Sequence, residues 1–234
     1  NQAEEGTIKK DGVEVSIKDP NDANALGIGM VHQHFKLVEC FSVLDNIIMG
    51  VEPTKHGFLQ KKEARERVLA LSEKYGLKVD PDALIEDITV GMQQRTEILK
   101  MLYRENEILI FDEPTAVLTE SEATQLVSVM KKIAANGIAI IFITHRLDEV
   151  MAAADSITIL RDGKLAATRE KEQTSVVELA ELMIGRKGES MVQAAPRTPP
   201  QDRVAMSIRD LHVDMPGEEV RGVSLEVYGG EIGR

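Results

Sequence analysis

Continuous apolar runs alternate with amphipathic stretches along the middle of the chain. Ile108–Phe111 is an uninterrupted apolar run, typical of a strand buried on both faces of a parallel sheet, and Ile138–Ile143 predicts another fully apolar strand. Between them, Thr119–Glu122 reads as a capping box, apolar positions recur at helical spacing, and Asn136-Gly137 marks the end of the helix. Strand, helix and strand in this order predict a right-handed crossover, and therefore an α/β fold with a parallel sheet.

Flanking segments carry weaker signals of the same kinds. A strand at 26–31 runs into Gln33, and a helix begins near Gly91. Turn and capping residues then delimit the remaining predicted elements: an N-terminal hairpin at 7–15 that turns at Asp11-Gly12, a helix at Lys61–Tyr75 that Gly76 closes, a hairpin at 156–168 that turns at Asp162-Gly163, and a last helix from Ser175 through Met183.

The C-terminal part of the sequence changes character. A polar stretch containing Pro196, Pro199 and Pro200 reads as an interdomain linker, and a new β pattern begins at Arg203. The chain starts at Asn1 and stops just after a second strand signal at 222–227, so we expect it to be a fragment.

Composition narrows the classes of partner and compartment. Lys and Arg number 28 against 39 Asp and Glu, a net charge of −11 with a pI near 5.0, which argues against a nucleic-acid-binding surface. The single cysteine, Cys40, excludes an internal disulfide framework and a cysteine-rich zinc site. The apolar runs are shorter than the roughly 20 residues that a membrane-spanning helix needs. With no secretory signal at the start, the expected compartment is the cytoplasm.

Two acidic residues follow the strand at 108–111 directly. Asp112 and Glu113 would leave the carboxyl edge of the sheet together, where open α/β sheets bind their ligands. Such a pair suits a Mg²⁺–nucleotide site, with one acid orienting the metal and the other a hydrolytic water; the alternative is a loop with two solvated acids. His145 follows the second apolar strand and would lie beside them if the two strands are neighbours, although a lone histidine there is more often structural.

Two further features favour phosphate and metal chemistry. Thr89 and Gly91 stand at a predicted helix start, where free N–H groups attract an anion, although an N-cap threonine alone explains the hydroxyl. The amide of Gln33 could reach a metal or a water. His32 and His34 could form a zinc site with His145, but no carboxylate helix motif accompanies them.

In combination, these motifs resemble the nucleotide-binding domain of ABC transporters. The similarity runs from about Gly6 to Met183 and implies a P-loop-NTPase-like parallel core with a helical subdomain at about 37–104 and an N-terminal antiparallel β piece. It implies that ATP and Mg²⁺ are the ligands. By this resemblance, Gln33 is the Q-loop glutamine that contacts the metal, and Asp112 is the Walker B metal residue. Glu113 is the catalytic glutamate, and His145 is the switch histidine. The signature motif that binds ATP contains Thr89, Gly91, Met92 and Gln93.

The stretches at 31–35, 90–94 and 113–119 are similar to one branch of that family, the ATPases of simple-sugar and nucleoside importers. Members of this branch carry two ABC domains in tandem, which implies a first domain at 1–184, a linker at 185–202 and the opening strands of a second domain at 203–234. Thr89-Val90 replaces the Ser-Gly of the wider family, and Thr119 replaces the D-loop aspartate, a change common in this branch.

The resemblance also implies partners and a location. The helical subdomain would contact transmembrane permease subunits, the second ABC domain would complete the ATP sites, and a substrate-binding protein would act indirectly, all at the cytoplasmic face of the membrane. Two alternatives stay open: a soluble, non-transport ABC ATPase, and a non-catalytic interaction module.

The 234 residues contain no G-x-x-x-x-G-K-[ST] loop, which supplies most of the phosphate binding in this family. We therefore expect the chain by itself to bind ATP weakly and to hydrolyse it negligibly. Calorimetric titration with ATP, together with a phosphate-release assay, checks this expectation. Micromolar affinity with Mg²⁺-dependent turnover would contradict it.

Overall fold

The computed structural model describes residues 5–32, 35–55, 57–185, 203–215 and 218–229. The chain divides into two compact units, residues 1–185 and 186–234, and each is described by itself.

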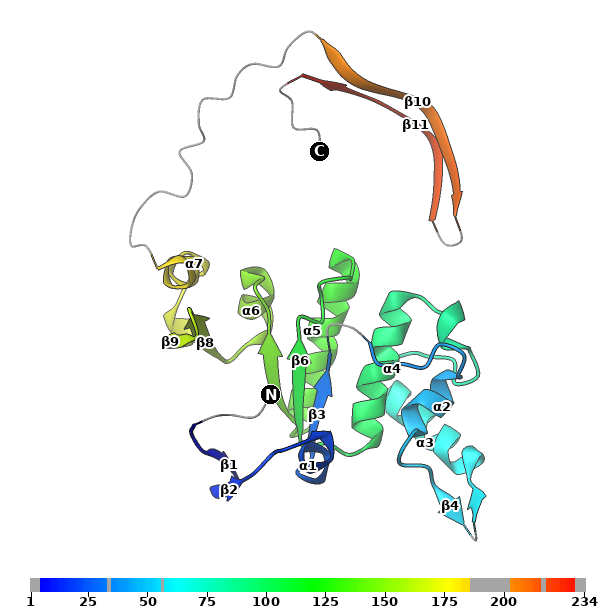
Figure 1. Cartoon of the computed structure of the whole chain (residues 1–234), viewed down its shortest axis with the longest axis vertical. Coiled ribbons are helices and arrows are strands. Elements are labelled where there is room, and N and C mark those ends of the chain that lie inside the picture. Colours follow the sequence, from blue (N-terminus) through cyan, green and yellow to red (C-terminus); the bar gives the residue numbers. More distant parts are fainter. Residues whose placement is uncertain (1–4, 33–34, 56, 186–202, 216–217, 230–234) are drawn as a thin grey trace. The chain divides into compact units, whose positions relative to one another are not determined.

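A three-stranded parallel sheet with the order β3-β6-β7 forms the centre of the first unit (Figure 1). The strands are β3 (Ile28–Val31), β6 (Ile108–Asp112) and β7 (Ala139–Ile143). Val31 pairs with Phe111 on one side of β6, and Asp112 pairs with Ile143 on the other. All three strands therefore end at the same edge of the sheet, as the predicted crossover requires.

Three helices connect or flank these strands along the chain. The 16-residue helix α5 (Glu120–Ala135) links β6 to β7, starting at the capping box on Thr119 and ending before Gly137, whose φ is 88°. Helix α1 (Pro20–Ala25) precedes β3, and α6 (Leu147–Ala153) follows β7 and packs against α5. Along the chain, helix α5 thus connects the two strands whose ends carry the predicted acidic and histidine residues.

A helical subdomain lies on the β3 side of the sheet (Figure 1). It shares one hydrophobic core with the sheet, in which Ile47, Ile98 and Phe111 are fully buried. Helix α3 ends at Gly76 in the left-handed conformation, as predicted. The helical subdomain consists of α2 (Val43–Ile48), β4 (Thr54–Lys55), β5 (Phe58–Leu59), α3 (Lys61–Tyr75), the 3-10 turn η1 (Ile85–Asp87) and α4 (Val90–Tyr103).

Two hairpins complete the first unit. Both turn at Asp-Gly pairs with positive φ, Asp11-Gly12 and Asp162-Gly163, as the sequence predicts for type I′ turns. The second hairpin packs with α7 around Leu179 in a separate small core. The elements concerned are β1 (Ile8–Lys10), β2 (Val13–Val15), β8 (Ser156–Arg161), β9 (Lys164–Glu170), the 3-10 turn η2 (Lys171–Gln173) and α7 (Val176–Ile184).

The second unit contains one antiparallel hairpin among its described residues. It consists of β10 (Val204–Met215) and β11 (Glu218–Tyr228), with register shifts that interrupt the pairing. Apolar side chains such as Met206, Leu211 and Leu225 remain about half exposed. The predicted linker at 185–202 lies almost entirely outside the described residues.

Burial of the central strands differs from the sequence prediction. In β6 only the face with Leu109 and Phe111 is fully buried, and the other face is partly exposed. In β7, Ile141 and Ile143 are 51% and 47% exposed. Ile110 pairs with Ile141 and Asp112 with Ile143, so these residues lie on one face of the sheet, and that face is the less buried one in both strands.

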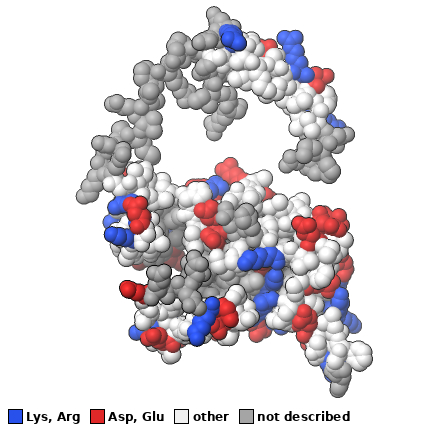
Figure 2. All heavy atoms as spheres, in the orientation of Figure 1, with Lys and Arg blue, Asp and Glu red and all other residues white. Residues whose placement is uncertain are grey.

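The surface carries acidic and basic side chains interspersed over the face shown in Figure 2. Among the described residues, no helix combines the length and apolar character needed to cross a membrane.

The capping box at α5 gives a stability prediction. The N–H and the hydroxyl of Thr119 both donate to Glu122 Oε2, at 3.0 and 2.8 Å, and lower the pKa of that carboxyl from its ordinary 4.5. We expect Thr119→Ala to lower the free energy of unfolding by about 1 kcal/mol at neutral pH, measured by urea denaturation. Because the pKa of Glu122 is lowered in the folded state, the stability linked to its ionisation is present above pH 4.5 and lost as the pH falls.

The effect of Thr119→Ala should therefore shrink in acid. Thr124→Ala is the matched control, since its hydroxyl bonds only to the Glu120 carbonyl within the same helix. Equal destabilisation by both variants would contradict a specific role for the cap.

Candidate functional site

The backbone turns sharply where β6 ends. Asp112 is the last residue of the strand and is partly buried, and Glu113 takes a φ of 44°, which a non-glycine residue rarely adopts. The Glu113 N–H donates to the Ile143 carbonyl at 2.9 Å, so the turn is tied to the end of β7. The strained residue is therefore held by the neighbouring strand.

His145 lies beside Glu113. Its Nδ1 is 3.3 Å from Glu113 Oε1, and the two side chains are 68% and 34% exposed. This pair comes from the ends of two adjacent parallel strands and faces solvent, where both groups can reach a ligand. The expected juxtaposition of His145 and Glu113 is thus present in the structure.

Some of the other residues expected at this edge of the sheet are not among the residues that the structure describes. Gln33 and His34 lie outside the described residues, and His32 follows the end of β3. Among the described residues, no group of three or more His, Cys, Asp or Glu side chains could hold a metal ion. A single half-buried carboxylate at Asp112 still fits Mg²⁺, because that ion keeps several waters and takes its other oxygens from substrate phosphates.

Thr89 caps the start of α4. Its hydroxyl accepts weakly from the Met92 N–H at 3.4 Å, and its carbonyl accepts from the N–H groups of Met92 and Gln93, both at 2.9 Å. The N–H groups of Met92 and Gln93 are therefore occupied within the helix. The N–H groups of Val90 and Gly91 and the hydroxyl proton of Thr89 remain as the donors that an anion could meet.

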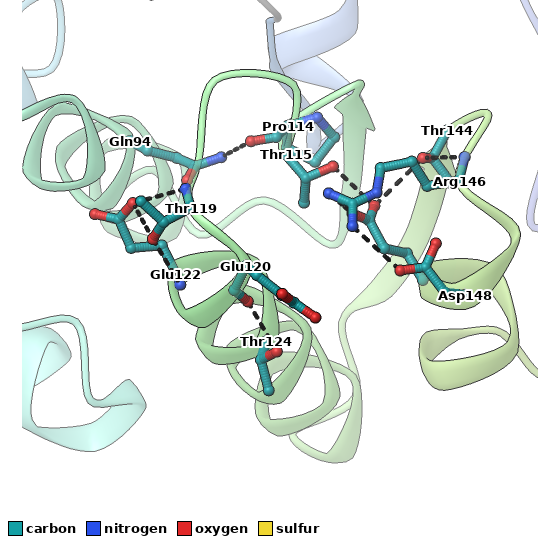
Figure 3. Close-up of polar contacts among 11 residues, drawn as sticks. Gln94, Pro114, Thr115, Thr119, Glu120, Glu122, Thr124, Thr144, Arg146 and Asp148 are labelled. Atoms are coloured by element: carbon teal, nitrogen blue, oxygen red, sulfur yellow. Dashed lines mark hydrogen bonds and ion pairs between the residues drawn. The ribbon is translucent and has the colours of Figure 1, made fainter. Parts of the chain in front are cut away.

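The two glutamines of α4 point away from such an anion. Gln93 Nε2 donates to the carbonyls of Ile85 and Ile88, at 3.3 and 3.4 Å, so its amide ties the start of α4 to the η1 turn that precedes it. The buried Gln94 amide donates to the Pro114 carbonyl, directly after the acidic pair (Figure 3). The sequence analysis missed Gln94, because a glutamine inside a helix carries no signal of its partner.

A buried carboxylate behind the pair was also missed. Glu149 on α6 is 4% exposed and accepts from the hydroxyl of Thr115, which follows Glu113 by two residues. The sequence offers one hint, since a glutamate on the first turn of a helix that follows an apolar strand can face the sheet.

The chain is similar to characterised proteins over most of its length. The family profile described as "ABC transporter" matches residues 1–116. The chain is 50% identical to the nucleoside import ATP-binding protein NupA of Lactococcus lactis over 97% of its own length and 45% of that protein. It is 46% identical to the guanosine import ATP-binding protein NupO of Bacillus subtilis, over 99% of its length and again 45% of the relative. The chain therefore spans less than half the length of these relatives.

Solved structures support the fold. A dimeric ATP-binding cassette in a post-hydrolysis state, bound to ADP and Pi, superposes with a TM-score of 0.62 over 73% of this chain and 75% of its own, at 22% identity. A second ATP-binding cassette gives a TM-score of 0.67 over 77% and 78% of the two chains. At this identity the likeness shows the fold alone.

Close packing at Gly91 gives a prediction for the start of α4. A Cβ at this position would lie 2.4 Å from Glu122 Oε1, and Glu122 is already fixed by the capping box of α5. We expect Gly91→Ala to displace that carboxylate and lower the unfolding free energy by about 1 kcal/mol, the value of a lost cap. In a Glu122→Ala background the same substitution should be neutral or stabilising, because alanine favours a helix over glycine.

A double-mutant cycle followed by urea denaturation measures this coupling. Additive effects of Gly91→Ala and Glu122→Ala would show that the two residues do not constrain each other.

Proposed function

The chain belongs to the ABC transporter ATP-binding family, and we propose that it forms an ATPase domain in the motor subunit of an importer for nucleosides or simple sugars. The relatives named for nucleoside and guanosine import, and the 37% identical ribose import ATP-binding protein of Rubrobacter xylanophilus, support this class of substrate. The single observation that carries the ATPase assignment is the Glu113–His145 pair at the edge where Asp112 ends β6.

Hydrolysis at this edge requires one residue that orients the water, one that contacts the γ-phosphate and one that holds the metal. Glu113, His145 and Asp112 are the candidates for these roles. The Glu113 carboxylate accepts a hydrogen bond from a water and orients its oxygen toward the γ-phosphorus. The imidazole of His145, held against the same carboxylate, offers its other nitrogen to the γ-phosphate. As the water oxygen bonds to phosphorus, the bond from phosphorus to the β–γ bridging oxygen breaks and leaves its electron pair on ADP, and the water proton that Glu113 accepts ends on the released phosphate.

Asp112 is the residue that would hold Mg²⁺, with Gln33 as its second protein ligand. When bound, Mg²⁺ neutralises the charge that develops on the phosphate oxygens. Placing Asp112 within the strand and Glu113 one residue beyond it separates the metal-holding carboxylate from the water-orienting one.

The start of α4 serves a second ATP site, shared with another ABC domain. The Thr89 hydroxyl and the free N–H groups of Val90 and Gly91 would contact its γ-phosphate, with Met92 exposed at the rim. Gln93 would support this site from behind, since its side chain bonds to the carbonyls of Ile85 and Ile88 at the η1 turn.

The helical subdomain would receive the transmembrane permease subunits at the cytoplasmic face of the membrane. Val38, Phe41 and Leu84 are 36%, 44% and 37% exposed there, and the segments that carry them are joined by the Ile85 N–H to Phe41 carbonyl bond. Exposed apolar side chains on a rigid surface suit a protein partner. A substrate-binding protein would deliver the solute to the permease.

The hairpin β10–β11 supports a tandem arrangement. Its half-exposed apolar residues call for a further layer of structure, as the opening strands of a second ABC domain would have. We accordingly assign the first domain to residues 1–184, the linker to 185–202 and the start of the second domain to 203–234.

The role of Glu113 is testable in the full-length protein that contains this chain. We expect Glu113→Gln to lower kcat for ATP hydrolysis by about 10²-fold or more, with little change in nucleotide affinity, since the amide keeps the shape but loses the acceptor strength. Phosphate release and fluorescent-nucleotide binding measure the two quantities. Glu120→Gln is the matched control, an exposed acid on the first turn of α5. Unchanged turnover in Glu113→Gln would refute the proposed ATPase site.

A further inference from the structure

The carboxylate of Glu149 joins the two loops that carry Glu113 and His145. Its Oε2 accepts from Thr115 Oγ1 at 2.7 Å and from Thr144 Oγ1 at 3.3 Å. Its Oε1 forms an ion pair with Arg146 at 3.0 Å. Figure 3 shows the side chains of Thr115, Thr144 and Arg146 converging on one point between the two loops.

The Glu149 carboxylate is buried, and a buried charge raises the free energy of the folded state unless its hydrogen bonds and its counter-charge are kept. The Glu149 side chain is 5% exposed, and an ionised carboxylate out of water needs hydrogen-bond donors and a counter-charge. The two threonines supply the donors and Arg146 supplies the charge. Within the described part of the chain, Glu149 Oε1 makes no hydrogen bond beyond the ion pair, and Arg146 is its partner on that side.

The donors are adjacent to the reacting side chains along the chain. Thr144 directly precedes His145, and Thr115 follows Glu113 by two residues. The Thr144 hydroxyl also accepts from the Arg146 N–H at 3.1 Å, which closes the loop around His145. One oxygen of Glu149 therefore holds both loops at once, through hydroxyls that flank the 3.3 Å Glu113–His145 contact.

We propose that Glu149 is a positioning residue that fixes His145 relative to Glu113 through the shared hydroxyl bonds of Thr115 and Thr144. This inference rests on the proposed ATPase function. Since a shift of about 1 Å in a catalytic group can lower turnover by about 10²-fold, loss of either hydroxyl should impair the chemical step more than nucleotide binding.

Paired substitutions at Thr144 provide the test in the full-length protein. Thr144→Val keeps the shape and removes the hydroxyl, and we expect it to lower kcat by about ten- to a hundred-fold while KM for ATP changes less than about threefold. Thr144→Ser restores the hydroxyl and should recover most of kcat. Because Thr144 is partly buried while Glu149 is nearly fully buried, a substitution at Thr144 disturbs folding less than one at Glu149 would.

Two further variants complete the design. Thr115→Val combined with Thr144→Val should lower kcat by less than the product of the single effects, since both hydroxyls serve one carboxylate oxygen. Thr124→Val is the matched control, because it removes an exposed hydroxyl that bonds to the Glu120 carbonyl within α5 and not to Glu149. It should leave turnover unchanged.

The outcomes separate this proposal from the function on which it rests. Loss of turnover in Glu113→Gln, with wild-type kcat in Thr144→Val, would overturn the positioning role alone. A fall in kcat that Thr144→Ser does not rescue, or that is matched by an equal loss of nucleotide binding, would also overturn it. Full turnover in Glu113→Gln would instead remove the proposed ATPase site itself.

Discussion

The parallel pairing of β6 with β7 is the constraint on which the site depends. The register that sets Asp112 opposite Ile143 brings the ends of the two strands to the same level. The bond from the Glu113 N–H to the Ile143 carbonyl continues this ladder by one residue and fixes the strained turn. Because a one-residue slip would turn each side chain to the opposite face, the register of β6 and β7 also sets the Glu113–His145 contact.

Much of this frame could be predicted from the sequence, because its signals are local. Apolar runs, the Thr119 capping box and the Asp-Gly turns each fix structure within a few residues, and they appear where they were expected. Short helices such as α2 and α6 carry too few periodic residues to be recognised. The exposure of Ile141 and Ile143 was not predictable, because burial depends on what packs against that face of the sheet rather than on the residues of β7.

The polar contacts of the site show the same limit. The sequence marks Glu113 and His145 because polar residues directly after apolar strands are conspicuous. Glu149 and Gln94 are ordinary helix residues in the sequence, and only the fold reveals that both are nearly fully buried against the acidic loop. Candidate ligand-contacting residues can thus be read from strand ends, while the buried polar residues around them depend on packing between distant elements.

Buried polar side chains connect the acidic loop to more than one part of the first unit. The Gln94 amide bonds to the Pro114 carbonyl and joins this loop to α4, while Glu149 joins it to the loop of His145. Glu97, also on α4 and 3% exposed, accepts from the Lys36 N–H at 2.9 Å and so holds the segment that follows β3. Since a buried polar group is costly to leave unpaired, a shift of α4 strains these contacts together. Helix α4 and the acidic loop are therefore linked through the buried Gln94–Pro114 hydrogen bond, so a displacement of either one costs the other a buried polar contact.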